Sequence, residues 1–314
     1  MKVLNVCFVG VGSIAKRHIR NIKTVCNHRN IQVYIDVVRR SGSMNDELSV
    51  SGVRSVFNDI PETGIKYDAV FITNPTVFHI DTLKKYHHIG KNFFIEKPVS
   101  MVSQIKMAED MVYRDGTIYY VACPLRYSAV IQYIKNNIAI NEVISIRSIS
   151  SSYLPEWRAG TDYRNTYSAC NDLGGGADID LIHEWDYITY LFGIPDYVKC
   201  MYGKKSGLEI NSRDFAIYIA EYKDKIAELH LDYFGRSTIR EIMVLTKEDT
   251  IIGDLVKNQI VYLKKGKKIL FNEERDDYQK RELDFFIDMI EGKISNDNNI
   301  LNAVKILKLT QGEL

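Results

Sequence analysis

The sequence predicts an α/β protein of two domains, in which a doubly wound parallel sheet is followed by an α+β domain with a mainly antiparallel sheet. Three observations support this fold class. The chain of 314 residues is long for one hydrophobic core. Residues 1–122 alternate short apolar runs with amphipathic segments, whereas residues 123–314 contain several strand-like runs in succession. We therefore expect a domain boundary after residue 122.

The apolar runs of the first domain are nearly continuous, which is typical of parallel strands that are buried on both faces. We expect these strands at residues 3–9, 33–38, 69–73, 93–95 and 118–122. The segments between them have helical periodicity at residues 14–25, 78–88 and 102–113. Strands and helices that alternate in this way form a sheet covered by helices on both faces.

The second domain changes this rhythm. It begins with a predicted helix at 129–137 and a long strand at 143–152, and a glycine-led helix follows from residue 174. Further strands are expected at 197–202, 215–222, 226–233, 240–245, 250–254 and 259–263. Short turns between successive strands predict antiparallel pairing. Two helical patterns, 279–291 and 300–310, close this expected domain.

Composition limits the classes of partner. The chain has 41 basic and 40 acidic residues, and this balance does not suggest a nucleic-acid partner. No apolar run approaches the ~20 residues of a membrane span, and the N-terminus has no cleavable signal pattern. Five scattered cysteines without a CxxC pair argue against a disulfide framework and a structural zinc site. We expect a cytoplasmic protein with no membrane partner and no metal.

A glycine-rich turn lies between the first predicted strand and the first predicted helix. Gly10, Gly12 and Ala15 form the pattern GxGxxA, which is the Rossmann dinucleotide-binding fingerprint when it stands between a strand and a helix. The first glycine permits the tight turn, and the second lets the backbone approach a pyrophosphate. Ser13 and Ile14 open the helix, whose N-terminus attracts phosphate groups.

The end of the second strand bears on the choice between NAD(H) and NADP(H). Asp36 lies near the position where an acid would bind the ribose hydroxyls, but the apolar run continues to Val38. If the strand ends near Arg39, then Arg39, Arg40 and Ser41 surround the 2′ position. That register favours NADP(H) over NAD(H). The alternative is that the two arginines are only a solvated strand end.

The segment 174–186 carries a histidine among carboxylates. A glycine turn leads into a predicted helix in which His183 lies between Asp180 and Asp186. Histidine exchanges protons near neutral pH, and a neighbouring carboxylate can fix its tautomer. The sequence leaves open which of the two acids orients His183. A hydrogen-bonded histidine on a buried helix face is the structural alternative.

Five motifs together resemble the glucose-fructose oxidoreductase / inositol dehydrogenase (Gfo/Idh/MocA) family, in that family's order and spacing. They are GVGSIAKRH at 10–18, Ile72-Thr73-Asn74-Pro75 with His79, Glu96-Lys97-Pro98, Leu125-Arg126-Tyr127, and the block 174–186. The resemblance covers nearly the whole chain. It implies a Rossmann domain, a second domain with a large open sheet that builds homodimers or homotetramers, and NAD(P)-dependent oxidation or reduction of a sugar or polyol. Residues 153–169 are similar to members found with polysaccharide and acylated-sugar biosynthesis.

The resemblance also implies the roles of individual residues. Lys97 matches the lysine beside the nicotinamide, and it follows the strand 93–95 at the edge where parallel sheets bind ligands. His183 matches the catalytic histidine. Asp180 matches the acid before it, although the spacing here is three residues and the family's is four. Further residues expected at the cofactor are Thr73, Asn74, Pro75, His79 and Glu96.

We expect His183 to exchange the proton of a substrate hydroxyl while Lys97 holds the oxygen. The expected substrate contacts are Arg126, Trp157, Arg158 and Tyr163, together with Asp180 and His183. These aromatic and guanidinium groups suit a sugar, a sugar nucleotide or an acylated sugar. Alternatives are a non-sugar substrate such as an imine, a biliverdin-like tetrapyrrole or a dihydrodiol, an elimination that uses bound NAD transiently, or a non-catalytic NADP-binding sensor or scaffold.

Overall fold

The computed structural model describes residues 1–60 and 67–313 and divides the chain into two compact units. Unit 1 consists of Met1–Ala122 and Arg275–Val304, and unit 2 of Cys123–Glu274 and Lys305–Leu314. The first boundary coincides with the one expected after residue 122. The expected second domain, 123–314, differs from unit 2, because the segment Arg275–Val304 packs with the N-terminal sheet.

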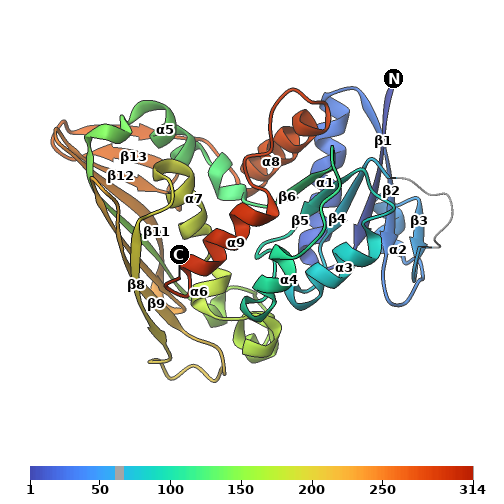
Figure 1. The fold of residues 1–314 in the computed structure, drawn as a ribbon, viewed down its shortest axis with the longest axis horizontal. Helices are drawn as coiled ribbons and strands as arrows, with labels where there is room; N and C mark the ends of the chain where they lie inside the picture. Colours follow the sequence, from blue (N-terminus) through green and yellow to red (C-terminus); the bar gives the residue numbers. More distant parts are fainter. Residues whose placement is uncertain (61–66, 314) are drawn as a thin grey trace. The chain divides into compact units, whose positions relative to one another are not determined.

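Unit 1 is built on a six-stranded parallel sheet, with helices α1, α3 and α8 among its elements (Figure 1). The order of the strands is β3-β2-β1-β4-β5-β6. Their bounds are β1 Lys2–Val9, β2 Ile31–Val38, β3 Ser55–Phe57, β4 Ala69–Ile72, β5 Asn92–Ile95 and β6 Ile118–Val121. The helices are α1 Ser13–His28, α2 Asp46–Val50, α3 His79–Tyr86, α4 Ile105–Glu109 and α8 Arg275–Ile290. Sequence analysis did not predict the short elements α2 and β3.

Helix α8 belongs to unit 1 because its apolar face enters the core of the parallel sheet. The Phe286 ring lies 5.3 Å from the Phe94 ring and 5.9 Å from the Phe71 ring, measured between centroids. The buried Tyr120 hydroxyl on β6 donates to Glu282 over 3.0 Å. These side chains explain why the segment after residue 274 returns to the first unit.

Unit 2 is built on an eight-stranded sheet in the order β14-β13-β12-β11-β7-β10-β9-β8. The pair β7 and β10 is parallel, and the other neighbouring strands are antiparallel. The bounds are β7 Val143–Tyr153, β8 Tyr197–Gly203, β9 Phe215–Glu221, β10 Ile226–Asp232, β11 Phe234–Thr246, β12 Thr250–Asp254, β13 Gln259–Tyr262 and β14 Lys267–Leu270. This is the mainly antiparallel sheet that the sequence predicts.

The sheet of unit 2 has one covered face. Helices α5 Ala129–Asn137, α6 Ala177–Asp180 and α7 His183–Phe192 contact its strands β12, β9, β10 and β7. Helix α9 Ile300–Leu309 closes the chain. Buried side chains such as Leu229 and Tyr218 alternate along the strands with Glu228 and Ile219, the latter 57% exposed. The alternation shows that the two faces of the sheet have different environments.

The described residues contain neither a helix suited to span a membrane nor a cluster of side chains suited to hold a metal ion. No helix within residues 1–60 and 67–313 has the length and apolar character needed to cross a membrane. In the same part of the chain, no group of three or more histidine, cysteine, aspartate or glutamate side chains is arranged to hold a metal ion.

Candidate active site

The glycine turn of unit 1 forms an open cradle at the N-terminus of α1. Gly10 has a φ of +92°, and a Cβ atom there would lie 2.7 Å from the backbone of Asn74, so only glycine fits. Gly12 precedes α1, and a Cβ atom on it would meet nothing within 4 Å. Ser13 is exposed at the start of the helix, whose first amides have no partner within the helix. The space and the free amides therefore fit a pyrophosphate.

The loop after β4 contacts the glycine turn. The buried Thr73 hydroxyl donates to the Gly10 carbonyl over 2.9 Å, so it ties the two turns together. The Asn74 amide nitrogen donates to Thr82, while the buried Asn74 Oδ1 atom has no hydrogen-bond partner among residues 1–60 and 67–313. Pro75 is exposed beside it. The unpaired Asn74 oxygen is the atom of this loop that is available to a donor on a ligand.

His79 links two loops at the carboxyl edge of the sheet. Its Nε2 atom lies 2.8 Å from the Asn74 carbonyl oxygen and its Nδ1 atom 2.9 Å from the Pro98 carbonyl oxygen. The side chain is 1% exposed, and this burial lowers the pKa of His79. His79 therefore holds the loops in place, and its ring does not face solvent.

Glu96 and Lys97 come directly after β5. Glu96 lies 2.5 Å from Nε2 of His18, which is buried on α1. Burial alone would raise the pKa of Glu96, but the hydrogen bond with His18 and the charges of His18, Lys97 and His79 lower it overall. Lys97 is half-buried and joined to Pro98 by a cis peptide bond. The structure thus places Lys97 at the edge of the sheet where the sequence predicts it.

The second strand ends at Val38, and Arg39 follows it at once. The amide of Gly42 donates to the Arg39 carbonyl over 2.9 Å, and this turn leaves Arg40 and Ser41 exposed. No hydrogen bond or ion pair engages the side chain of Arg39 or Arg40 within residues 1–60 and 67–313. The two guanidinium groups are therefore available to an anion.

Asp36, the alternative ribose ligand, is already engaged. Arg54 donates to its two carboxylate oxygens over 3.0 and 2.6 Å, and the Tyr67 hydroxyl donates over 2.9 Å. The carboxylate is 2% exposed. A ribose hydroxyl would have to displace one of these donors in order to bind Asp36.

In unit 2, the helix expected after Gly174 is interrupted between Asp180 and His183. Helix α6 ends at Asp180, Leu181 has a ψ of +27°, and α7 starts at His183. In one continuous helix, a spacing of three residues would place Asp180 and His183 on the same face. The break between α6 and α7 means that they do not share such a face. The turn at 181–182 reorients the chain at the point where this sequence has one residue fewer than the family pattern.

The Asp180 carboxylate is surrounded by hydroxyl groups. Tyr167 donates to one oxygen, and Ser168 donates to the other over 2.7 Å. The buried Tyr233 hydroxyl lies 3.3 Å from the same oxygen as Ser168. Gly175 allows this arrangement, because a Cβ atom there would lie 2.3 Å from the Tyr167 carbonyl oxygen. The glycine turn therefore packs directly on the loop that supplies two of the donors.

Asp186 has a different partner. Arg126 donates to both of its oxygens, over 2.9 Å from Nε and 2.8 Å from Nη2. The guanidinium is 2% exposed and lies 4.9 Å from the centre of the Tyr190 ring. The guanidinium is thus engaged within unit 2, and its contact with substrate stays a prediction.

Helix α7, which starts with His183, is fixed to the sheet by buried polar groups. Arg240 on β11 lies 2.8 Å from the fully buried Glu184 carboxylate. Burial raises the pKa of Glu184, although Arg240 opposes this shift. The Tyr187 and Ser148 hydroxyls lie 2.6 Å apart, and the Trp185 ring packs 5.2 Å from Tyr218. His183 is itself half-buried at the first position of this anchored helix.

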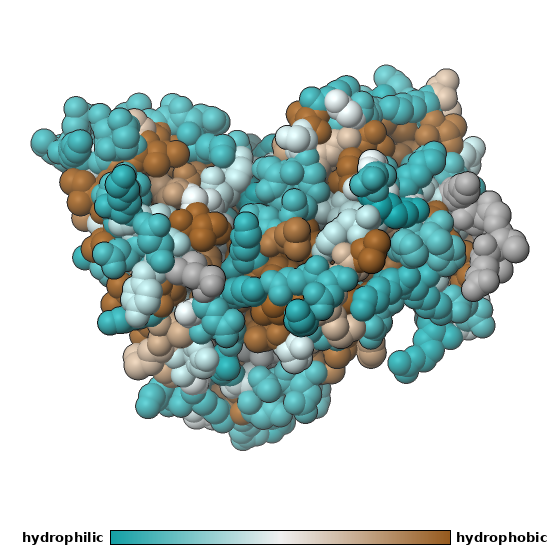
Figure 2. Space-filling model, viewed as in Figure 1, coloured by the Kyte–Doolittle hydropathy of each residue, from teal (hydrophilic) through white to brown (hydrophobic). Residues whose placement is uncertain are grey.

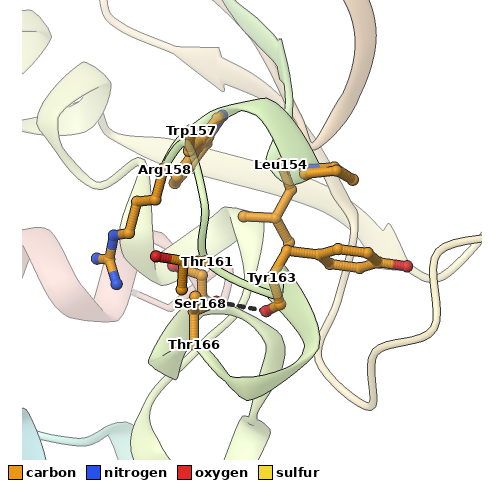
Figure 3. A pocket seen from close by; sticks show the side chains of 8 residues that line it. Leu154, Trp157, Arg158, Thr161, Tyr163, Thr166 and Ser168 are labelled. Carbon is orange, nitrogen blue, oxygen red and sulfur yellow. Dashed lines mark hydrogen bonds between the residues drawn. The ribbon is translucent and has the colours of Figure 1, made fainter.

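The loop 154–168 carries the remaining expected substrate contacts (Figure 3). Trp157 and Arg158 line a small pocket in this loop. The Trp157 indole nitrogen donates to Ser152 over 2.9 Å, and its ring meets Tyr233 edge to face at 5.2 Å. Tyr163 also lines the pocket, but its hydroxyl accepts from the Glu209 amide over 3.1 Å. Arg158 is exposed.

Residues 4–122 match the family described as "Oxidoreductase family, NAD-binding Rossmann fold", designated GFO_IDH_MocA. The match covers the N-terminal unit, which is therefore similar to the NAD-binding Rossmann domain of these oxidoreductases. An uncharacterized oxidoreductase, YrbE of Bacillus subtilis, is 26% identical over 188 residues, which are 59% of this chain and 52% of that relative. The matched segment therefore spans about half the length of the curated relative.

Solved structures extend the likeness to the whole fold. Levoglucosan dehydrogenase in complex with NADH has a TM-score of 0.82 at 14% identity, with 99% of this chain and 96% of that chain covered. The WlbA dehydrogenase from Bordetella pertussis, in complex with NADH and UDP-GlcNAcA, has a TM-score of 0.78 at 16% identity, with 99% and 95% covered. An oxidoreductase from Thermotoga maritima has a TM-score of 0.79 at 18% identity, with the same coverage. At these low sequence identities, the TM-scores show that the proteins share a fold.

Several residues of the candidate site are not indicated by any sequence pattern. They are His18 beside Glu96, the hydroxyl donors of Asp180, and the pair of Glu184 with Arg240. Ser168 lies 12 residues from Asp180, but Tyr233 lies 53 residues away. No local pattern joins partners so far apart.

Proposed function

We propose that the protein is an NAD(P)-dependent oxidoreductase that transfers hydride between the nicotinamide and a hydroxyl or keto carbon of a sugar, a sugar nucleotide or an acylated sugar. The observation that carries the proposal is the open N-terminus of α1 beneath the Gly10 turn, in a unit of an NAD-binding oxidoreductase family. Ser13, Ile14 and the unpaired Asn74 oxygen are the groups that would hold the cofactor. When bound, the nicotinamide supplies the hydride donor or acceptor.

The proposal assigns the proton chemistry to two side chains. His183 takes the proton of the substrate hydroxyl during oxidation and returns it during reduction. Lys97 donates a hydrogen bond to the reacting oxygen and stabilises its negative charge. Asp180, held as an acceptor by Tyr167 and Ser168, contributes a fixed negative charge near the start of α7. Such a charge favours a protonated histidine.

The proposed substrate class rests on the loop of unit 2 and on the relatives' names. Aromatic rings and hydroxyl groups line the pocket at 154–168, and sugars present both apolar ring faces and hydroxyl donors. Proteins with the same fold include levoglucosan dehydrogenase and a UDP-N-acetylglucosamine 3-dehydrogenase from Acidithiobacillus ferrooxidans. These names support sugar-related substrates for the present chain.

We further propose that NADP(H) is preferred over NAD(H). Arg39 and Arg40 follow β2 directly, and Asp36 is already bound by Arg54 and Tyr67. A 2′-phosphate would meet two guanidinium groups, whereas a 2′-hydroxyl would find its usual carboxylate engaged.

The open face of the unit 2 sheet supports a homodimer or homotetramer. Met201 is 59% exposed, Ile219 57% and Ile226 47%, on the neighbouring strands β8, β9 and β10. Figure 2 shows hydrophobic patches among hydrophilic residues on the visible face of the molecule. Apolar side chains that cluster on a sheet face are typical of protein interfaces.

A hydride-transfer assay tests the function. The absorbance of the nicotinamide reports oxidation or reduction of the cofactor. A panel of sugars and sugar nucleotides, tested in this way, should contain a compound that the protein turns over. His183→Asn should then lower kcat by ~100- to 10,000-fold, because general acid-base catalysis contributes about that factor. The matched control is His88→Asn, which changes an exposed histidine of unit 1 and should retain parent turnover.

Two outcomes would contradict this assignment. Parent turnover in His183→Asn would remove His183 from the chemistry. Tight cofactor binding without hydride transfer to any member of the panel would favour the non-catalytic sensor.

A further inference from the structure

The loop 154–168 encloses a pocket whose ligand is not defined by the proposed reaction (Figure 3). The pocket has a volume of about 10 Å³, which is room for about one water-sized group, so a larger ligand group would lie at its mouth. Its lining residues are Leu154, Pro155, Trp157, Arg158, Thr161, Tyr163, Thr166 and Ser168. All of them belong to unit 2, so the pocket is complete within that unit.

Arg158 is the cation of this pocket, and nothing in the described part of the chain neutralises it. It is exposed, and no hydrogen bond or ion pair engages its guanidinium within residues 1–60 and 67–313. Arg164, six residues further along the same loop, is different. Its guanidinium binds Asp162 over 2.9 Å and Glu209 over 2.7 Å. Arg158 therefore retains its capacity to bind a carboxylate or a phosphate.

The hydroxyl groups of the pocket offer both kinds of hydrogen bond. The Thr161 hydroxyl has no partner among the described residues and can donate. Thr166 donates to the Tyr163 carbonyl over 2.6 Å, and Ser168 donates to Asp180 over 2.7 Å. Their protons are thus directed away, and their oxygen lone pairs remain able to accept. The pocket combines donors for an anion with acceptors for ligand hydroxyl groups.

We propose that the mouth of this pocket is a subsite for an anionic group, a carboxylate or a phosphate, on a substrate that also carries hydroxyl groups. The exposed Arg158 and Thr161 bind the anion at the mouth, beside the Trp157 ring. One hydroxyl group of the ligand enters the pocket, where Thr166 or Ser168 accepts from it. Because Ser168 also donates to Asp180, an occupied subsite lies one side chain away from the candidate catalytic carboxylate. Assigning the ligand as substrate rests on the proposed function.

Tryptophan fluorescence provides a direct test that needs neither cofactor nor turnover. The chain has two tryptophans, and Trp185 is fully buried, so Trp157 is the one that reports on the pocket. The probes are glucuronate, glucose 6-phosphate, inorganic phosphate and neutral glucose. We expect a saturable change with anionic probes, a much weaker response to glucose, and loss of the response in Trp157→Phe.

The arginine variants make the assignment specific. Arg158→Gln should weaken the binding of the anionic probe about 10- to 100-fold, the range expected for charge-assisted hydrogen bonds. Arg158→Lys should be intermediate, because it keeps the charge and loses the planar fork. Arg164→Gln is the matched control and should bind like the parent protein. A thermal melt of each variant verifies that it is folded.

Each outcome decides the proposal. Equal binding of glucose and the anionic probes, parent affinity in Arg158→Gln, equal losses in Arg158→Gln and Arg164→Gln, or no saturable response to any anionic probe would overturn it. Tighter binding of glucuronate or of glucose 6-phosphate identifies the anion as a carboxylate or a phosphate. Binding without later hydride transfer would reject the proposed reaction and retain the subsite, while hydride transfer that is indifferent to Arg158→Gln would do the opposite.

Discussion

The proposed preference for NADP(H) depends on the side chains of Arg39 and Arg40. Replacing both with serine should raise the Kd for NADP(H) about 10- to 100-fold, because charge-assisted hydrogen bonds to a 2′-phosphate are lost. The Kd for NAD(H), which lacks that phosphate, should stay unchanged and serves as the internal control. Titration calorimetry with both cofactors gives the two constants. Tighter binding of NAD(H) by the parent protein would contradict the NADP(H) preference.

Asp180 and Asp186 flank His183 in the sequence, but their carboxylates have different hydrogen-bond partners in the structure. Asp186 accepts two hydrogen bonds from a buried guanidinium, and Asp180 accepts from hydroxyl groups of the loop that lines the pocket. Sequence analysis left the choice between them open, because Arg126 is 60 residues away from Asp186. The assignment of Asp180 as the acid that acts with His183 stays a prediction.

At the scale of elements, α8 contributes to the stability of unit 1. Phe286→Ala should reduce the free energy of unfolding by about 3–5 kcal/mol, since it removes a buried ring that contacts Phe71 and Phe94. Phe78→Ala, which changes a ring that is 48% exposed, is the control and should have a small effect. Urea denaturation, followed by far-UV circular dichroism, measures both. A small loss for Phe286→Ala would argue against the core packing of α8.

The sequence patterns predicted elements best where one periodicity extends over many residues. The apolar runs of β1 and β2, and the glycine turn before α1, were correctly placed because their signals are local. The three residues of β3 and the break between α6 and α7 were missed. A three-residue strand is too short for periodicity, and the turn at Leu181 lies inside a segment of helical composition. The role of α8 depends on contacts with Phe71 and Phe94, which are far from it in the chain.

For the whole molecule, the proposed association through the unit 2 sheet can be tested at a single position. Ile219→Lys should dissociate the oligomer, because a symmetric interface would bury the new charge on each subunit. Val112→Lys adds the same charge at an apolar residue of unit 1 that is 85% exposed, and should leave the assembly intact. Light scattering after size-exclusion chromatography measures the masses. A monomeric parent protein, or an intact Ile219→Lys oligomer, would contradict the proposal.

Because Arg275–Val304 belongs to unit 1, it determines where a chimera between related proteins should be joined. The chain passes from one unit to the other after Ala122, after Glu274 and after Val304. Most of unit 2 is therefore an insertion within the sequence of unit 1, and a polypeptide that stops at residue 122 would lack Phe286. A chimera that borrows substrate recognition from a relative should exchange 123–274 as a cassette with two junctions, leaving α8 with its original sheet.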